Sequence, residues 1–140
     1  MDIARGFSIE QPVAFVPWGI TETQLKALLG ANLRHVTRGY YTAHCKSLGG
    51  MEHELGFHFK PRANGRLLEL EFFRQAYPCQ EESFKEFQDH FEHVFGAPSK
   101  TFPGTCGLPS HEWQLKGVTI VHFVHDRFGP EEHMRIKWSV

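Results

Sequence analysis

The sequence predicts a single α+β domain, residues 1–140, in which a helix followed by antiparallel strands occurs twice. The first observation is a constant shift of 66 positions, which places "LKALLGA" at 25–31 on "FEHVFGA" at 91–97. The second is helical spacing of apolar residues in each copy, and the third is a hairpin signal after the first helix. The copies span about 19–73 and 81–139, and we expect both helices on one face of the sheet.

The first helix is expected directly after Thr21. Thr21 and Gln24 have the spacing of a capping box, in which each residue satisfies a free amide of the other. Leu25, with Leu28 and Leu29, then forms the buried stripe, and Gly30 provides the stop.

The second helix is predicted over residues 81–95. Ser83 with Glu86, or a cap slightly upstream, starts it, and Gly96 ends it. Its apolar face consists of Phe84, Phe87, Phe91, Val94 and Phe95, which recur three and four residues apart.

Strands follow each helix. Asn64 and Gly65 form the strongest hairpin signal, because both residues tolerate the positive φ of a type I′ turn. The second copy has equivalent strands at 118–125 and 133–138, and a further strand is expected before each hairpin, at 39–47 and 111–115. A two-residue loop at Asn64-Gly65 pairs Phe59 with Leu70, Phe57 with Phe72, Lys60 with Glu69 and His58 with Glu71.

Charge and cysteine content limit the function classes. The net charge is −1 and the basic residues are scattered, so we expect no nucleic-acid partner. No segment has the length of a membrane span and the N-terminus has no export signal, so we expect no membrane association. The three cysteines are odd in number and lack paired spacing, which favours a reduced, cytoplasmic setting over a disulfide framework.

The chain contains ten histidines, yet their spacing does not predict a metal site, a cofactor or a catalytic residue. His53 and His58 differ by an odd number, so they point to opposite faces of one strand. Cys45 follows His44 directly, and only a histidine from elsewhere in the fold would reach its thiol. Protonation of all ten histidines predicts a large rise in charge between pH 7 and pH 5.

The face of the sheet left open by the helices is the candidate binding surface. Mixed charges with aromatic residues are typical of protein interfaces, although a solvated face with cross-strand ion pairs has the same composition. The partner-binding candidates are Glu54, His58, Glu69, Glu71, Arg135 and Lys137, with the aromatic residues Tyr41 and Trp113 and, beside Tyr41, Tyr40.

Two other functions remain open at this point. His58 with Glu54 and Glu71 forms an acid and base cluster that would suit a small enzyme or a ligand-binding domain. The apolar run "VTIVHFVH" at 118–125 would suit an assembly module if it lay at an exposed sheet edge.

The stretch "WGITETQLKALLGANLRHVTRGYYT", followed by a strand hairpin, resembles the repeat of the beta-lactamase inhibitor protein and of the small outer-membrane assembly lipoproteins. The resemblance covers Gly19 to Phe73 and extends to bacterial immunity proteins on similar scaffolds. It implies that the sheet face binds and blocks another protein. This chain lacks the lipidation cysteine and paired cysteines of exported members, so the expected function is a cytoplasmic, non-enzymatic immunity or inhibitor protein that occludes a toxin or an enzyme.

Overall fold

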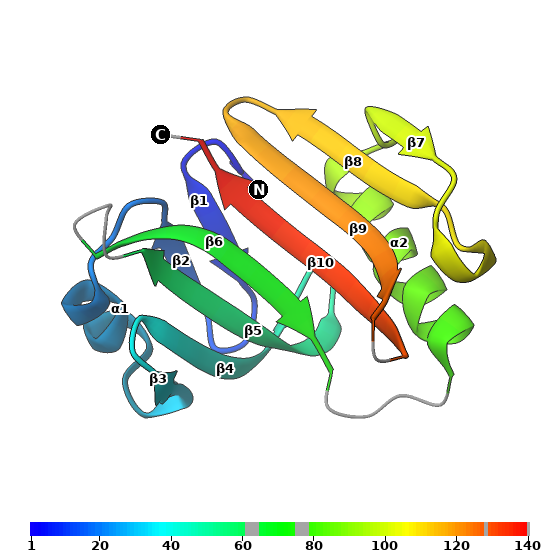
Figure 1. Ribbon diagram of the computed structural model, residues 1–140. Coiled ribbons are helices and arrows are strands. Elements are labelled where there is room, and N and C mark those ends of the chain that lie inside the picture. The colour runs from blue at the N-terminus through cyan, green and yellow to red at the C-terminus, as the bar shows by residue number, and fades with distance from the viewer. Residues whose placement is uncertain (61–64, 75–78, 128, 140) are drawn as a thin grey trace.

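An N-terminal hairpin precedes a helix with four strands and then a second helix with four strands (Figure 1). The computed structural model describes residues 1–60, 65–74, 79–127 and 129–139. The elements are β1 (Gly6–Ile9), β2 (Ala14–Pro17), α1 (Glu22–Leu29), β3 (Leu33–Thr37), β4 (Tyr40–Ser47), β5 (Met51–Lys60), β6 (Arg66–Phe73), α2 (Gln80–Phe95), β7 (Lys100–Phe102), β8 (Ser110–Leu115), β9 (Val118–Asp126) and β10 (Pro130–Trp138), with short 3₁₀ turns at Gly30–Asn32 and Thr105–Gly107.

One antiparallel sheet contains eight strands in the order β3-β4-β5-β6-β10-β9-β8-β7, and β1 pairs with β2 in a separate two-stranded sheet. The two halves of the chain meet where β6 pairs with β10, with Leu70 opposite Ile136 and Phe72 opposite Met134. The sheet is therefore continuous across both halves, and the α+β prediction is confirmed.

Local sequence signals set the helix ends. In α1 the Thr21 hydroxyl accepts a hydrogen bond from the Gln24 amide at 3.2 Å, and the Gln24 side chain accepts one from the Thr21 amide at 2.9 Å, which confirms the capping box. Helix α2 begins at Gln80, upstream of Ser83, with Cys79 at its N-cap, so the start at Ser83 was wrong and the upstream alternative holds. Its end at Gly96, which has φ 82°, agrees with the prediction.

The β5-β6 hairpin is present, but its predicted register was wrong by two residues at Phe57 and His58 and by three at Phe59 and Lys60. His58 lies opposite Glu69 and Phe57 opposite Leu70, with an irregularity in the pairing after His58. Because a shift of two keeps every side chain on its own face, the apolar pattern fits both registers and does not distinguish them. The turn residue Asn64 lies outside the described residues, and Gly65 has φ 65°.

The core lies between α2 and one face of the sheet, here called the covered face. In Figure 1, α2 lies behind the strands of the second half. Phe91 of α2 meets Phe72 and Trp113 edge to face, with ring centroids 5.5 and 5.7 Å apart. Phe7 of β1 also packs against Phe72, with ring centroids 5.4 Å apart, so the N-terminal hairpin contributes to this core.

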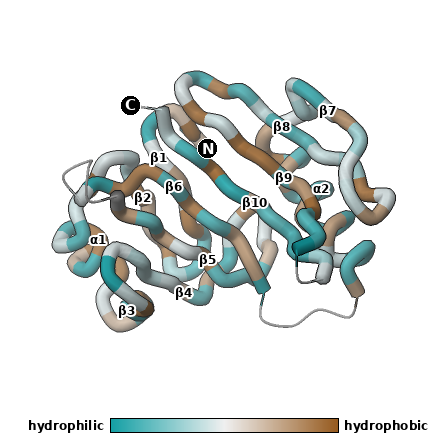
Figure 2. The backbone as a smooth tube through the Cα atoms, in the orientation of Figure 1, coloured by the Kyte–Doolittle hydropathy of each residue, from teal (hydrophilic) through white to brown (hydrophobic). Residues whose placement is uncertain are grey.

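Alternation along the strands separates this core from the opposite face. In β10, Met134 and Ile136 are buried, while Arg135 and Lys137 point the other way, and Figure 2 shows the same change of hydropathy from residue to residue. The face that carries Arg135 and Lys137 is called the open face, because neither described helix crosses in front of it in Figure 1.

Candidate functional site

A network of charged side chains occupies the middle of the open face. Arg135 on β10 donates from Nη1 to Glu69 Oε2 at 2.8 Å and from Nη2 to Glu71 Oε2 at 3.0 Å. Lys137 Nζ lies 3.8 Å from Glu69 Oε1. The antiparallel pairing of β6 with β10 places both carboxylates within reach of one guanidinium, which fixes its orientation.

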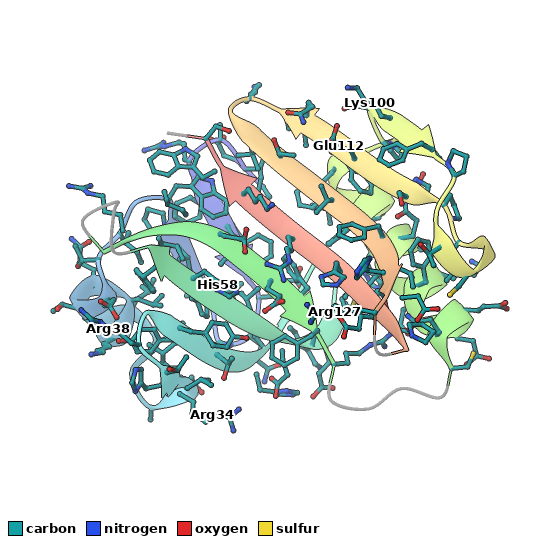
Figure 3. All side chains as sticks on the ribbon, in the orientation of Figure 1. Arg34, Arg38, His58, Lys100, Glu112 and Arg127 are labelled. Carbon is teal, nitrogen blue, oxygen red and sulfur yellow. The ribbon has the colours of Figure 1, made fainter. Side chains whose placement is uncertain are left out.

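Tyr40 and His58 complete this central network from β4 and β5. The Tyr40 hydroxyl donates to Glu71 Oε1 at 3.3 Å, and His58 Nε2 lies 3.3 Å from the same oxygen. The two rings are stacked with centroids 4.5 Å apart. Burial and the charge of Glu71 raise the pKa of Tyr40 to about 12, and the His58 hydrogen bond, with Arg135, lowers the pKa of Glu71. Figure 3 shows His58 over the central strands.

Gly56 provides the space in which the Tyr40 ring lies. A Cβ at Gly56 would meet the Tyr40 ring and hydroxyl at 2.9 Å. We therefore expect Gly56→Ala to lower the free energy of unfolding by about 1 kcal/mol, because Tyr40 has to move away from Glu71. Urea denaturation checks this, with the same change in a Tyr40→Ser background as the control. In the Tyr40→Ser background, Gly56→Ala should be neutral or stabilising, since glycine is the poorer strand residue. Equal losses of stability in both backgrounds would contradict the packing argument.

Glu54 has a partner on β4. His44 on β4 holds it, with Nδ1 3.1 Å from Glu54 Oε2, and the other ring nitrogen lies 2.6 Å from Glu52 Oε1. The hydrogen bond with Glu52 raises the pKa of His44. In the predicted cluster, Glu54 thus has a contact with His44, and the contact between His58 and Glu71 exists despite the wrong register.

Two of the aromatic candidates lie on the covered face. Tyr41 is 4% exposed and donates its hydroxyl hydrogen bond to Glu22 of α1 at 2.8 Å. Trp113 is fully buried and donates from Nε1 to the carbonyl of Gly96 at 2.8 Å. Their expected place on the open face was wrong, because in each case the neighbouring residue, Tyr40 or Glu112, takes the outward position.

The sequence reasoning missed an apolar groove at the β7-β8 end of the open face. Its volume is about 270 Å³, and it is lined by Phe102, Ser110, His111, Glu112, Val121 and Phe123. Phe102 is 50% exposed, and Phe123 stacks on His133 at 4.9 Å. The available signal was the apolar run 118–125, in which Val121 and Phe123 are apolar at outward-facing positions.

That run forms β9, which lies between β8 and β10 inside the sheet. The condition for the assembly module, an exposed edge at 118–125, is therefore not met. The groove, rather than a free strand edge, is what this run contributes to the surface.

A histidine does reach Cys45 from elsewhere, but the pair is inert. His53 Nε2 lies 3.8 Å from Cys45 Sγ, and both residues are buried. Burial raises the pKa of Cys45 to about 12, so the nucleophilic thiolate does not form near neutral pH. Burial also lowers the pKa of His53 to about 4, so this histidine takes no part in a charge rise between pH 7 and pH 5.

A larger cavity of about 560 Å³ opens beside α2 and the start of β5. It contains both charge signs, including the ion pair between Arg74 and Glu86 at 3.0 Å. His58 and Glu71 line neither this cavity nor the groove. Within the described ranges, no three His, Cys, Asp or Glu side chains converge as ligands for a metal ion.

Neither described helix has the length and apolar character needed to cross a bilayer. Comparisons with protein-family models, with curated proteins and with solved structures find no match to this chain. The geometry of the open face is therefore the basis for a functional proposal.

Proposed function

We propose that this protein binds another protein across the open face of its sheet and acts by occlusion rather than by catalysis. The observation that carries the proposal is the junction of the apolar groove with the central network. Val121, in the groove, lies opposite Glu112 on one side and opposite Arg135 on the other. An apolar centre beside oriented charges is the arrangement found at energetically important parts of protein interfaces.

The groove indicates what the partner presents. Its volume of about 270 Å³ suits one large apolar side chain, which would contact Phe102, Val121 and Phe123 in the lining of the groove. Lys100 lies opposite Glu112 at the rim, and both are labelled in Figure 3. Two rim charges of opposite sign favour one orientation of a charged neighbour on the partner, so they contribute specificity more than affinity.

Occlusion of a toxin or an enzyme, as by an immunity or inhibitor protein of bacterial type, is the form of binding that we propose. The similarity of residues 18–42 and the following hairpin to the beta-lactamase inhibitor type of repeat supports it. We place the interaction in the cytoplasm, which is supported by three free cysteines. An enzyme using Glu54, His58 and Glu71 is the weaker alternative, because His58 and Glu71 line neither the cavity beside α2 nor the groove.

We further propose that the two halves are diverged copies whose helices pack on one face. Contacts of Tyr41 with α1 and of Trp113 with α2 support this arrangement. Ile136 lies opposite Leu70 and 66 positions after it, in agreement with the shift. In β5 and β9 the shift of 66 places buried Phe57 on the outward-facing Phe123, so the copies require a local change of shift there.

A pull-down from native lysate with three baits tests the binding function. The baits are the wild type, Phe102→Asp in the groove, and Val13→Asp, a control in which the same charge is added at a 91% exposed position outside the groove. We expect one stoichiometric partner with the wild type and the control, and at least a tenfold loss with Phe102→Asp, because a buried unpaired carboxylate opposes binding. No stoichiometric partner, or equal capture by all three baits, would contradict the proposal.

The purified partner then separates occlusion from simple association. If it is a toxin or an enzyme, addition of one equivalent of this protein should abolish its activity, and Phe102→Asp should restore that activity. Full partner activity in the saturated wild-type complex would show binding without occlusion.

A further inference from the structure

A buried histidine on the covered face has hydrogen-bond partners at both ring nitrogens. His122 on β9 is fully buried and stacks on Phe84 of α2, with ring centroids 4.0 Å apart. Its Nδ1 lies 2.8 Å from Gln88 Oε1, and its Nε2 lies 2.6 Å from Glu132 Oε2. One partner comes from α2 and the other from β10, so His122 joins the helix to the sheet.

The neighbours of Gln88 fix where the Nδ1 hydrogen lies. The Gln88 amide nitrogen donates to Glu92 Oε2 at 3.2 Å, which turns the amide oxygen toward His122. An amide oxygen only accepts hydrogen bonds, so His122 Nδ1 carries a hydrogen. In a neutral imidazole the other nitrogen, Nε2, then has a lone pair and no hydrogen.

That lone pair would point at a carboxylate oxygen 2.6 Å away. The other oxygen of Glu132 already accepts from the Ser83 hydroxyl at 2.8 Å and from Gln80 Nε2 at 3.3 Å. Two acceptors do not approach to 2.6 Å without a hydrogen between them. The same contact forms readily if one proton is shared between the imidazole and the carboxylate.

We infer that His122 of β9 and Glu132 of β10 together hold one proton at neutral pH, within a network that Gln88, Ser83 and Gln80 connect to α2. Burial lowers the pKa of His122, and the hydrogen bond and charge of Glu132 oppose that effect. Whether the proton lies on the imidazole nitrogen or on the carboxylate oxygen, the pair holds one proton.

Among the described residues, His111, Arg74, Glu92 and His53 are titratable or charged groups with contacts that lead toward this pair. On β8, His111 lies opposite His122 in the strand pairing, and its ring centroid is 6.1 Å from that of the same Phe84. Arg74, which follows β6, donates to the Ser83 hydroxyl at 2.9 Å, and that hydroxyl in turn donates to Glu132. Glu92 acts through Gln88, and Phe87 lies between His122 and His53 of β5.

The shared proton predicts the sign of a pH effect on stability. In the unfolded chain the two groups have ordinary pKa values of about 6.5 and 4.3, so above about pH 7 neither retains a proton. If the folded pair still holds one proton, folding takes up a proton, and the folding constant falls about tenfold for each pH unit until the pair releases it. His53 has a depressed pKa and so acts in the opposite sense: its contribution is lost as pH falls below about 6.5.

Unfolding in urea at pH 7, 8 and 9 tests this inference, with Glu132→Gln as the matched variant. A glutamine amide donates to the His122 lone pair without an added proton and still accepts from Ser83. We expect the folding constant of the wild type to fall about tenfold more per pH unit than that of Glu132→Gln. Equal slopes would overturn the inference.

Spectroscopy of the wild type at pH 7.5 gives a test that does not depend on the variant folding. The ¹⁵N shifts of His122 and the ¹³C shift of the Glu132 carboxyl report where the proton lies. A protonated Nε2 or a protonated carboxyl supports the inference. A ring with a bare Nε2 beside an ionised carboxylate would overturn it.

Discussion

Replacing Phe91 with alanine is expected to lower the free energy of unfolding by about 3–5 kcal/mol, the largest effect of any substitution considered for this protein. Phe91 is fully buried, and its ring meets Phe72 of β6, Trp113 of β8 and His122 of β9 at 5.5 to 5.7 Å. One ring on α2 therefore contacts strands from both halves of the sheet. Its removal leaves a cavity that those strands cannot fill without losing their pairing.

Phe95→Ala is the matched control on the same helix. Phe95 is only half-buried and contacts Phe91 at 5.9 Å, so its loss should cost about 1 kcal/mol. Urea denaturation at pH 7 measures both free energies. If the two variants lose the same stability, packing of α2 through Phe91 is not what holds the two halves together.

Both ends of α1, the end of α2 and six of the strands, β4, β5, β6, β8, β9 and β10, were predictable because local sequence determines them, whereas β3 and β7 were not predicted. The capping box at Thr21 and the glycine stop at Gly96 use hydrogen bonds and φ values within a few residues. These hydrogen bonds and φ values depend little on the rest of the fold. The separate hairpin of β1 and β2 was not predicted, because its apolar residues become meaningful only once Phe7 lies against Phe72.

The hairpin register and the orientation of some side chains depend on distant parts of the chain. A slip of two residues at His58 preserves the face of every side chain, so the pattern alone fits either register. In Tyr40-Tyr41 both residues are aromatic, and alternation does not say which one points inward. The contact of Tyr41 with Glu22 of α1 decides it.

The candidate site was predictable in part, where the alternation of side chains along the strands determines which residues share a face. Glu69, Glu71, Arg135 and Lys137 do meet in one network, because alternation places them on the polar face of adjacent strands. The groove was missed because Phe102 lies on a three-residue strand with no pattern to identify it. Histidine occurs on both buried and exposed faces of strands, so a pattern of polar and apolar residues does not identify it as buried. The burial of His122 is explained by its hydrogen-bond partners, Gln88 and Glu132.

Arg135→Met is expected to have the second-largest effect, a loss of about 2 kcal/mol in the free energy of unfolding at pH 7. Arg135 bonds both Glu69 and Glu71, whose side chains are 12% and 24% exposed. Methionine keeps much of the packing volume but leaves two adjacent carboxylates without their shared cation. The estimate is below that for a fully buried pair, because water still reaches part of the network.

The pH dependence of this loss follows from the two carboxylates. In the wild type, hydrogen bonding to His58 and the charge of Arg135 lower the pKa of Glu71, so its contribution is present above about pH 4.3 and disappears as pH falls through the folded value. Without Arg135, protonation of one carboxylate relieves repulsion between the two. The difference in the free energy of unfolding between Arg135→Met and the wild type should therefore be largest at pH 7 and become smaller toward pH 4.

Lys137→Met removes a cation from the same network and is the matched control. Lys137 is 54% exposed and its ammonium lies 3.8 Å from Glu69, so its loss should cost less than about 0.5 kcal/mol. Urea denaturation at pH 4, 5.5 and 7 compares the variants. Equal losses for Arg135→Met and Lys137→Met, or a loss at Arg135 that does not change with pH, would show that the guanidinium does not hold the two carboxylates together. A large, pH-dependent loss at Arg135 alone would show that the charged centre of the open face is fixed before any partner binds, which is the preorganisation that selective recognition requires.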